Sequence, residues 1–199
     1  MQNAIFGPET KNKSVSWLTV NVDSINKWSI GPIGGDFYDG LAGLSLFYYY
    51  LFEVTGNQNY KELFEILIYS AKQRLEEIND LSCFTGRSSL LYPLRKIIEN
   101  HNKHEYKTML QEIINDCDKN MNILRGYDWI GGTTSLIDQF LKLFQESNDF
   151  QYLNLSIKYG NYLLKQLDED NKIIGGFAHG ASSIALVLIK LGKVINNKS

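Results

Sequence analysis

Two residues of this chain stand where an enzyme could use them for acid–base chemistry. His179 directly precedes Gly180, and Asp128 lies four residues before Gly132. Imidazole and carboxylate side chains commonly transfer protons in enzymes, and a helix N-terminus lowers the pKa of a histidine beside it. Both residues are therefore candidate catalytic groups. Each also has a structural interpretation, because both can serve as helix caps, a common role for aspartate.

Other chemically active residues fit structural roles better. Asp39, directly before a glycine, is more typical of a helix cap than of a catalyst. Cys83 precedes a glycine by three residues, but a lone cysteine is usually a small buried hydrophobic residue, and Cys117 is expected in the core. His101 and His104 have a spacing that suits two metal ligands, yet no third ligand accompanies them, so a solvated loop is expected there.

The segments around these residues form an internal repeat. Four glycines, each followed by small or polar residues and then by an apolar run, are separated by 46, 46 and 48 residues: Gly40, Gly86, Gly132 and Gly180. Three tyrosines that open amphipathic segments are 46 residues apart: Tyr60, Tyr106 and Tyr152. Apolar positions behind these tyrosines fall on one face of a helix. Each repeat is therefore predicted to be a helical hairpin.

The two helices of each predicted hairpin differ in their surfaces. The glycine-led helix has little polar surface, whereas the second helix has a face of Lys and Glu. Repetition of such pairs gives an inner and an outer layer, and hence an all-α solenoid or a closed α/α toroid. No strand is expected. Residues 1–33 are predicted to be an irregular lead that packs on the first hairpin, and residues 34–199 to hold hairpins that start near 40, 86, 132 and 180.

The glycine-led helices of such an array point the same way. Their N-termini would gather at one end, which we call the mouth, and exposed N–H groups there would favour anions or developing negative charge. The mouth would be lined by four loops, with the sequences GGDFYDG, SCFTG, GYDWIGG and GGFAHG. Asp128 and His179 belong to the third and fourth of these loops.

Composition excludes several classes of function. With 20 basic and 22 acidic residues the net charge is −2, which argues against nucleic acid as a partner. The longest apolar stretch, residues 44–52, is too short to span a membrane, and the N-terminus does not resemble a signal peptide. Two cysteines are too few for a disulfide framework. We therefore expect a cytoplasmic protein.

Two of the glycine-rich segments resemble a known family. Residues 35–44 (GDFYDGLAGL) resemble the opening motif of the cyclase domain of class II lanthipeptide synthetases. Residues 175–181 (GGFAHGA) are similar to a motif of lanthionine synthetase C-like proteins, and Asp128 to Gly132 falls where that family has an aspartate followed by a glycine-rich helix start. A lead containing Trp17 and Trp28 is also similar. The resemblance covers residues 15–195.

The resemblance implies a fold, an activity and a site. The family fold is an α/α toroid of seven helical hairpins. Its members add cysteine thiols of a lanthipeptide precursor peptide to dehydroalanine or dehydrobutyrine, which forms lanthionine rings in lantibiotic biosynthesis. A zinc ion activates the thiol. By residue-wise correspondence, His179 would be the active-site histidine, which handles protons, and Asp128 the active-site aspartate.

The sequence also departs from the family pattern. The zinc ligands come from a tryptophan-cysteine-x-glycine and a cysteine-histidine-glycine motif in later repeats, and neither motif occurs here. The repeat count reaches about three and a half hairpins of seven. The sequence is therefore interpreted as the N-terminal half of the domain, a truncated cyclase that is inactive alone. It is either one piece of a split enzyme, whose partner would be the missing C-terminal half, or the product of a decayed gene.

Two other functions fit the repeat pattern. The first is a noncatalytic helical-repeat module that binds peptides on a concave face. The second is a carbohydrate-active enzyme of the α/α-toroid class, which needs paired acidic groups at the mouth. Asp39 and Asp128 could supply such a pair.

Overall fold

The structure, a computed structural model, describes residues 5–6, 14–22, 27–124, 126–169 and 173–196. Within these ranges the chain forms seven α-helices, two short 3-10 helices and four strands. The helices are α1 (Leu41–Thr55), α2 (Gln58–Leu75), α3 (Leu91–Asn100), α4 (His104–Lys119), α5 (Thr133–Ser147), α6 (Phe150–Glu169) and α7 (Ala181–Asn196). The 3-10 helices are η1 (Arg87–Leu90) and η2 (Met121–Ile123).

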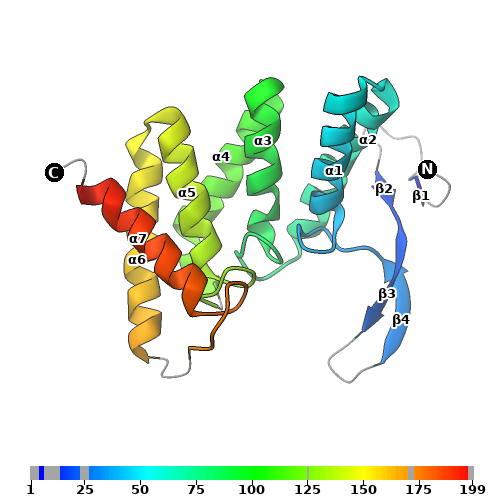
Figure 1. Cartoon of the computed structure of the whole chain (residues 1–199). Coiled ribbons are helices and arrows are strands. Elements are labelled where there is room, and N and C mark those ends of the chain that lie inside the picture. The colour runs from blue at the N-terminus through cyan, green and yellow to red at the C-terminus, as the bar shows by residue number, and fades with distance from the viewer. Residues whose placement is uncertain (1–4, 7–13, 23–26, 125, 170–172, 197–199) are drawn as a thin grey trace.

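The helices pack as successive hairpins (Figure 1). α1 packs against α2, α3 against α4, and α5 against α6, while α7 follows as the first helix of a fourth unit. The first helices of the units also contact one another in order, from α1 to α3, α5 and α7. This arrangement confirms the predicted all-α class. Closure of the array into a toroid remains a prediction.

The core lies between the helices of the array. Its largest fully buried side chains are aromatic and come from the first and second helices of the units: Tyr49, Phe64, Tyr106, Phe140 and Tyr159. Such rings bury a large apolar area each and dominate the energetics of packing. Among the described helices, none combines the length and the apolar character that crossing a bilayer requires.

Close backbone approach explains the glycines that precede the first helices. At Gly132 an added Cβ would lie 2.4 Å from the carbonyl carbon of Gly126, and at Gly180 it would lie 2.1 Å from the Ile174 oxygen. Gly132 has φ −147°, which any residue can adopt. The requirement is therefore for space and not for a left-handed backbone, because each loop folds back against its own helix start.

The N-terminal segment contradicts the expectation of an irregular lead without strands. β1 (Ile5–Phe6) pairs with β2 (Val15–Ser16), and β3 (Leu18–Val22) pairs with β4 (Trp28–Pro32), both antiparallel. The alternation of apolar and polar residues in β3 and β4 is the signal of a strand. Each segment is only five residues long, too short for this alternation to distinguish a strand from a loop in the sequence alone.

The base of this segment is fixed to the outer side of the first hairpin. Val15 is buried, and its N–H donates to the Ser70 hydroxyl over 2.9 Å. The Arg74 guanidinium donates to the Ile33 carbonyl and, over 2.9 Å, to the Ser16 hydroxyl. These contacts attach β2 and the end of β4 to α2, while β3 and β4 extend away from the helices (Figure 1).

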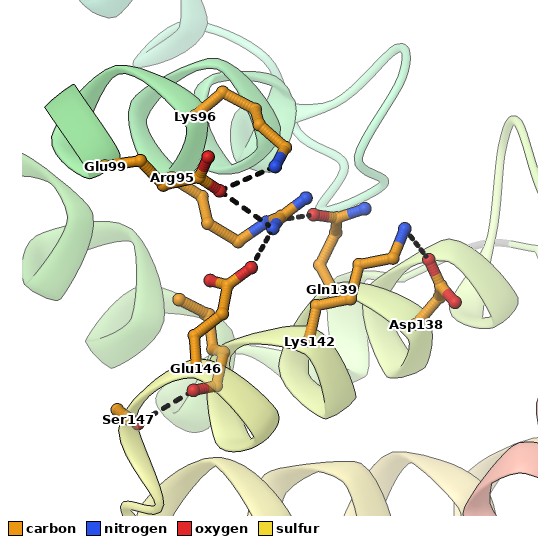
Figure 2. Close-up of polar contacts among 9 residues, drawn as sticks. Arg95, Lys96, Glu99, Asp138, Gln139, Lys142, Glu146 and Ser147 are labelled. Carbon is orange, nitrogen blue, oxygen red and sulfur yellow. Dashed lines mark hydrogen bonds and ion pairs between the residues drawn. The ribbon is translucent and has the colours of Figure 1, made fainter.

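Buried polar contacts join the first helices of neighbouring units. Arg95 of α3 is 4% exposed, and its Nε donates to Gln139 of α5 over 3.2 Å (Figure 2). Its guanidinium also pairs with Glu146 of α5 and lies 3.7 Å from Glu99. A buried guanidinium left without its partners would destabilise the fold, so these contacts specify how α3 and α5 align.

A second ionic contact joins α5 to α7. Asp138 of α5 is 1% exposed and lies 2.6 Å from the Lys142 ammonium on its own helix and 2.8 Å from that of Lys190 on α7. Figure 2 shows the pair with Lys142 beside the Arg95 contacts. Because a buried carboxylate needs a compensating charge, Lys190 helps to fix the position of α7.

Candidate functional site

The third and fourth glycine-rich loops are bound together by their backbones. The N–H groups of Trp129 and Ile130 both donate to the carbonyl oxygen of Ala178, over 3.1 and 3.3 Å. Ala178 directly precedes His179, and Trp129 directly follows Asp128. The backbone contacts therefore bring the two candidate catalytic residues to the same place.

Asp128 and His179 form a direct contact. The Nδ1 atom of His179 lies 2.8 Å from Oδ2 of Asp128, and the other carboxylate oxygen, Oδ1, accepts the Gly131 N–H over 2.6 Å. Both oxygens of Asp128 are thus engaged, which fixes the orientation of the carboxylate. The Asp128 side chain is 22% exposed, and the His179 side chain is 57% exposed. The carboxylate is held in the loop while the imidazole faces solvent.

This contact assigns the tautomer of His179. An ionised carboxylate can only accept hydrogen bonds, so Nδ1 carries the proton that is donated to Asp128. Nε2 is then the ring nitrogen that exchanges a proton with a bound molecule. The carboxylate also stabilises the imidazolium that forms when Nε2 takes up a proton. This arrangement suits a general acid–base group.

A hollow lies beside the pair. It has a volume of about 380 Å³, and five residues of the two loops line it: Gly126, Tyr127, Asp128, Ile174 and His179. The rings of Trp129 and Phe177 lie next to each other, with centroids 4.9 Å apart. Phe177 is 47% exposed, so this aromatic pair offers an apolar contact near the imidazole.

The glycine-rich loops and their helices match a family described as "Lanthionine synthetase C-like protein", over residues 31–199. The chain belongs to this family. It is also similar to the "Lacticin 481/lactococcin biosynthesis protein LcnDR2" of Lactococcus lactis subsp. lactis, with 24% identity over 205 residues. The match covers 98% of this chain and 21% of that protein, so the chain spans about a fifth of the length of its relative.

The helix N-termini of this lanthionine synthetase C-like chain are not the open anion sites that the sequence suggested. The Ala181 and Ser182 N–H groups at the start of α7 donate to the carbonyl oxygens of Ile174 and Gly176, over 2.9 and 3.1 Å. At the start of α5, the Thr133 N–H donates to the Gly126 carbonyl over 3.1 Å. The folded-back loops therefore accept hydrogen bonds from these N–H groups, which are then not free to bind an anion.

The alternative role of Asp128 and Asp39 as helix caps is not what the structure shows. The N-cap residues of α1 and α5 are glycines, and no side chain caps either helix. The Asp39 N–H instead donates to Oδ1 of Asp36 over 3.1 Å. Burial raises the pKa of the Asp36 carboxyl, and the neighbouring charge of Asp39 adds to this effect.

The two cysteines are buried, as their interpretation as core residues requires. Cys83 is 3% exposed and Cys117 is fully buried. Burial raises the pKa of the Cys83 thiol and raises that of Cys117 to about 12. The Cys117 thiol lies 3.0 Å from the Ser88 hydroxyl. Both side chains are therefore protonated at neutral pH and unsuited to metal binding or nucleophilic attack.

His101 is not the solvated loop residue that the sequence predicts. Its Nε2 lies 2.9 Å from Oε1 of Glu53, and its side chain is 20% exposed. The ring packs edge-on against Tyr49 and lies close to Phe52. The position at the C-terminal end of α3, directly opposite α1, explains this burial. His104 is instead the first residue of α4.

The described residues do not fit the zinc ion that the family implies. No group of three or more His, Cys, Asp or Glu side chains gathers in the described part of the chain. Structural zinc sites need four such ligands and catalytic ones need three. Cys83 and Cys117, the only thiols of the chain, are buried and protonated. We therefore assign no metal ligand to these residues.

The contact between Trp129 and Phe177 was not foreseen from the sequence. The sequence places Trp129 beside Asp128 in the loop GYDWIGG but does not indicate its partner. The two aromatic residues each lie three positions before the glycine that starts a helix, at Gly132 and Gly180. This shared position in the repeat is the signal that could have found them.

Proposed function

We propose that this chain takes part in lanthipeptide biosynthesis and supplies the acid–base residues of a lanthionine-forming site. The observation that carries the proposal is the 2.8 Å contact between Asp128 and His179, made by two loops of the family's glycine-rich series. The name of the Lactococcus lactis relative, a lacticin 481 and lactococcin biosynthesis protein, supports the same pathway. The proposed partner is a precursor peptide that contains cysteine and dehydrated residues.

Ring formation requires one proton transfer that suits His179. Addition of a thiol to dehydroalanine forms a bond between sulfur and the β carbon and consumes the carbon–carbon double bond. The electrons move onto the neighbouring carbonyl as an enolate, and the α carbon must then take up a proton. The imidazolium of His179 delivers this proton from Nε2, and the proton released by the thiol restores the balance. Asp128 stabilises the imidazolium and holds the ring in place.

The hollow beside the imidazole has the form that this step needs. It opens to solvent, so a peptide segment can enter it, and Trp129 and Phe177 provide apolar surface near His179. Peptides bind such sites through a few apolar contacts and a small number of placed polar groups. We propose that the thiol is activated by residues other than the described ones, so that this chain by itself closes no rings.

Substitution of the pair in the producing cells tests the proposal. His179→Asn keeps a polar side chain of similar size but removes the titratable nitrogen, and Asp128→Asn removes the charge that supports it. We expect His179→Asn to slow ring closure about 100-fold or more, a typical loss for one acid–base group, and Asp128→Asn to slow it less. Dehydrated peptides whose cysteines still react with N-ethylmaleimide would then accumulate, as mass spectrometry can show.

The matched control is Thr85→Asn. Thr85 directly precedes Gly86, as His179 precedes Gly180, so the same side chain is introduced at the corresponding position of another loop. This variant should give peptides with the wild-type number of rings. Full ring formation in His179→Asn cells, or wild-type cells whose peptides carry no lanthionine, would contradict the proposed function.

A further inference from the structure

The hairpin of β3 and β4 has one face that is entirely apolar. Residues opposite each other in antiparallel strands share a face, and alternate residues along a strand do the same. The apolar face consists of the pairs Leu18–Pro32, Val20–Ile30 and Val22–Trp28. The other face carries Thr19, Gly31, Asn21 and Ser29. The hairpin is therefore sharply two-sided although neither side rests on the helices.

This apolar face lies in water in the isolated chain. Trp28 is 74% exposed and Ile30 is 77% exposed, and Leu18, Val20 and Val22 are each at least half exposed. Exposed apolar area is costly in water, at about 25 cal/mol per Å². Contiguous exposed patches of this kind mark surfaces that contact another molecule or domain.

The strands also lack the features that protect solvent-exposed edges. Neither β3 (LTVNV) nor β4 (WSIGP) contains a charged residue, and five consecutive residue pairs follow one another without a bulge. Natural edge strands in water carry charges, bulges or prolines that prevent pairing, and here only Pro32 at the strand end does so. A two-stranded hairpin is marginally stable in water, so it needs a surface on which to pack.

The hairpin is held in a defined position relative to the helices. The Ile33 N–H donates to the Trp17 carbonyl over 2.9 Å and closes the base of the hairpin. Arg74 of α2 binds the Ile33 carbonyl and the Ser16 hydroxyl on either side of that base. A fixed base presents the apolar face in one direction, which reduces the ordering cost of docking.

The extents of the two matches indicate what covers this face. The family match begins at residue 31, so β3 and most of β4 lie outside it. The match to the Lactococcus lactis relative covers 98% of this chain and therefore includes the hairpin, yet it takes up only 21% of that long protein. The hairpin thus accompanies the helical domain in a protein with much additional chain.

We propose that the apolar face of β3 and β4 docks on another folded region of a synthetase, corresponding to the part of the relative that this chain does not match. The contact surface of that region would be aliphatic and aromatic without net charge, because the hairpin offers no charged strand residue to pair with. Docking would fix the acid–base pair of the helical domain at a set distance from the rest of the enzyme.

Site-specific photo-crosslinking in the producing cells tests this docking. Trp28→p-benzoylphenylalanine places the reactive group on the apolar face, and Ser29→p-benzoylphenylalanine places it on the polar face one residue away. Peptides crosslinked from position 28 should belong to polypeptide similar to the unmatched part of the Lactococcus lactis relative, with at least fivefold less product from position 29. Crosslinks to a second copy of this chain, crosslinks to a precursor peptide, or no product from position 28 would overturn the proposal.

A second variant separates docking from folding. Val20→Thr combined with Ile30→Thr keeps branched side chains that suit strands but makes the face polar. We expect at least tenfold less crosslinking from position 28, with unchanged circular dichroism and melting temperature of the purified chain. Undiminished crosslinking would contradict docking through this face. The readout does not involve ring formation, so this proposal and the proposed function can fail separately.

Discussion

The first and second glycine-rich loops form one pair, and the third and fourth form another. The two pairs share one backbone arrangement but differ in side chains. In the first pair, the N–H groups of Phe37 and Tyr38 both donate to the Phe84 carbonyl over 2.9 Å. In the last pair, Trp129 and Ile130 donate in the same way to Ala178. The two pairs are therefore repeats of one loop–loop contact.

The aspartates of the two pairs occupy equivalent positions but have different partners. Asp36 and Asp128 each lie four residues before a helix-starting glycine, and each accepts the N–H of the third residue that follows. Asp128 also contacts His179, whereas the position equivalent to His179 in the first pair is Thr85. The backbone thus provides the same carboxylate twice, and one side chain on the neighbouring loop decides whether it contacts an imidazole.

The packing of aromatic side chains also differs between the first and the last loop pair. Phe37 contacts both Phe84 and Tyr92, with ring centroids 5.4 and 5.5 Å apart, and these rings pack against the core. In the last pair, Phe177 contacts Trp129 but stays exposed. The first loop pair is closed by aromatic packing, and the last is open to solvent beside its histidine. The first pair is therefore packed on the core, whereas the last pair leaves its histidine accessible to solvent.

The largest expected effect concerns the backbone that both pairs share. Gly132→Ala should lower the free energy of unfolding by about 3 kcal/mol, because the new Cβ would lie 2.4 Å from backbone atoms of residues 126 and 127. Gly40→Ala should cost a similar amount, since its Cβ would lie 2.5 Å from the Asp36 carbonyl. Urea denaturation measures both.

Gly175→Ala is the matched control for these substitutions. No atom lies within 4 Å of the Cβ that it would add, so its effect should stay below about 0.5 kcal/mol. Equal stability of the Gly132 and Gly175 variants would show that the close approach of the loops is not what these glycines provide.

Substitution of the aromatic residues should lower the free energy of unfolding by less, and the loss should be larger in the first loop pair than in the last. Phe84→Ala should destabilise the chain by about 2 kcal/mol because this half-buried ring packs against the core. Phe177→Ala should cost less than about 1 kcal/mol, since an exposed ring loses little more than one aromatic contact. The comparison uses the same denaturation assay. A larger loss of stability for Phe177→Ala than for Phe84→Ala would contradict the view that the first loop pair is packed on the core and the last is open to solvent.

The smallest expected effect is a pH dependence that arises from Asp36. Burial raises the pKa of the Asp36 carboxyl in the folded state above its ordinary value, so folding favours the protonated form. The stabilisation is present below the ordinary pKa of the carboxyl and is lost as the pH rises through the raised pKa of the folded state. Solvent screens the charge of this partly exposed group, so the effect on stability is small.

Asp36→Asn should remove this fall in stability with rising pH, because the amide oxygen can still accept the Asp39 N–H but carries no charge. Thermal melts of the wild type and the variant between pH 3.5 and 7 measure the difference. If the melting temperature changed with pH to the same extent in the wild type and in the Asp36→Asn variant, the result would contradict the assignment.

Much of the helical array was predictable because its signals are local. Each first helix, or its preceding 3-10 turn, begins directly after one of the repeated glycines, at Leu41, Arg87, Thr133 and Ala181. Helix formation depends on neighbours three and four residues away, so apolar periodicity and small residues after glycine suffice to indicate it.

The polar contacts between helices were not predictable in the same way. Arg95 and Asp138 are charged residues that the sequence gives no reason to bury, yet they are 4% and 1% exposed. Their partners Glu146 and Lys190 lie 51 and 52 residues further along the chain. Only the packing of α3, α5 and α7 shows that these charges meet. The strands of the N-terminal segment are hard to predict for a different reason, because their alternating pattern is short.

The sequence by itself determined which residue types lie at the helix starts, including Asp128, His179 and the glycines before the helices. Only the tertiary structure decided that the Asp128 carboxylate contacts the His179 imidazole, although 51 residues separate them. The reason is that this contact depends on the relative position of α5 and α7. Two backbone hydrogen bonds to Ala178 and the buried pair of Asp138 with Lys190 set that position, and no local pattern encodes it.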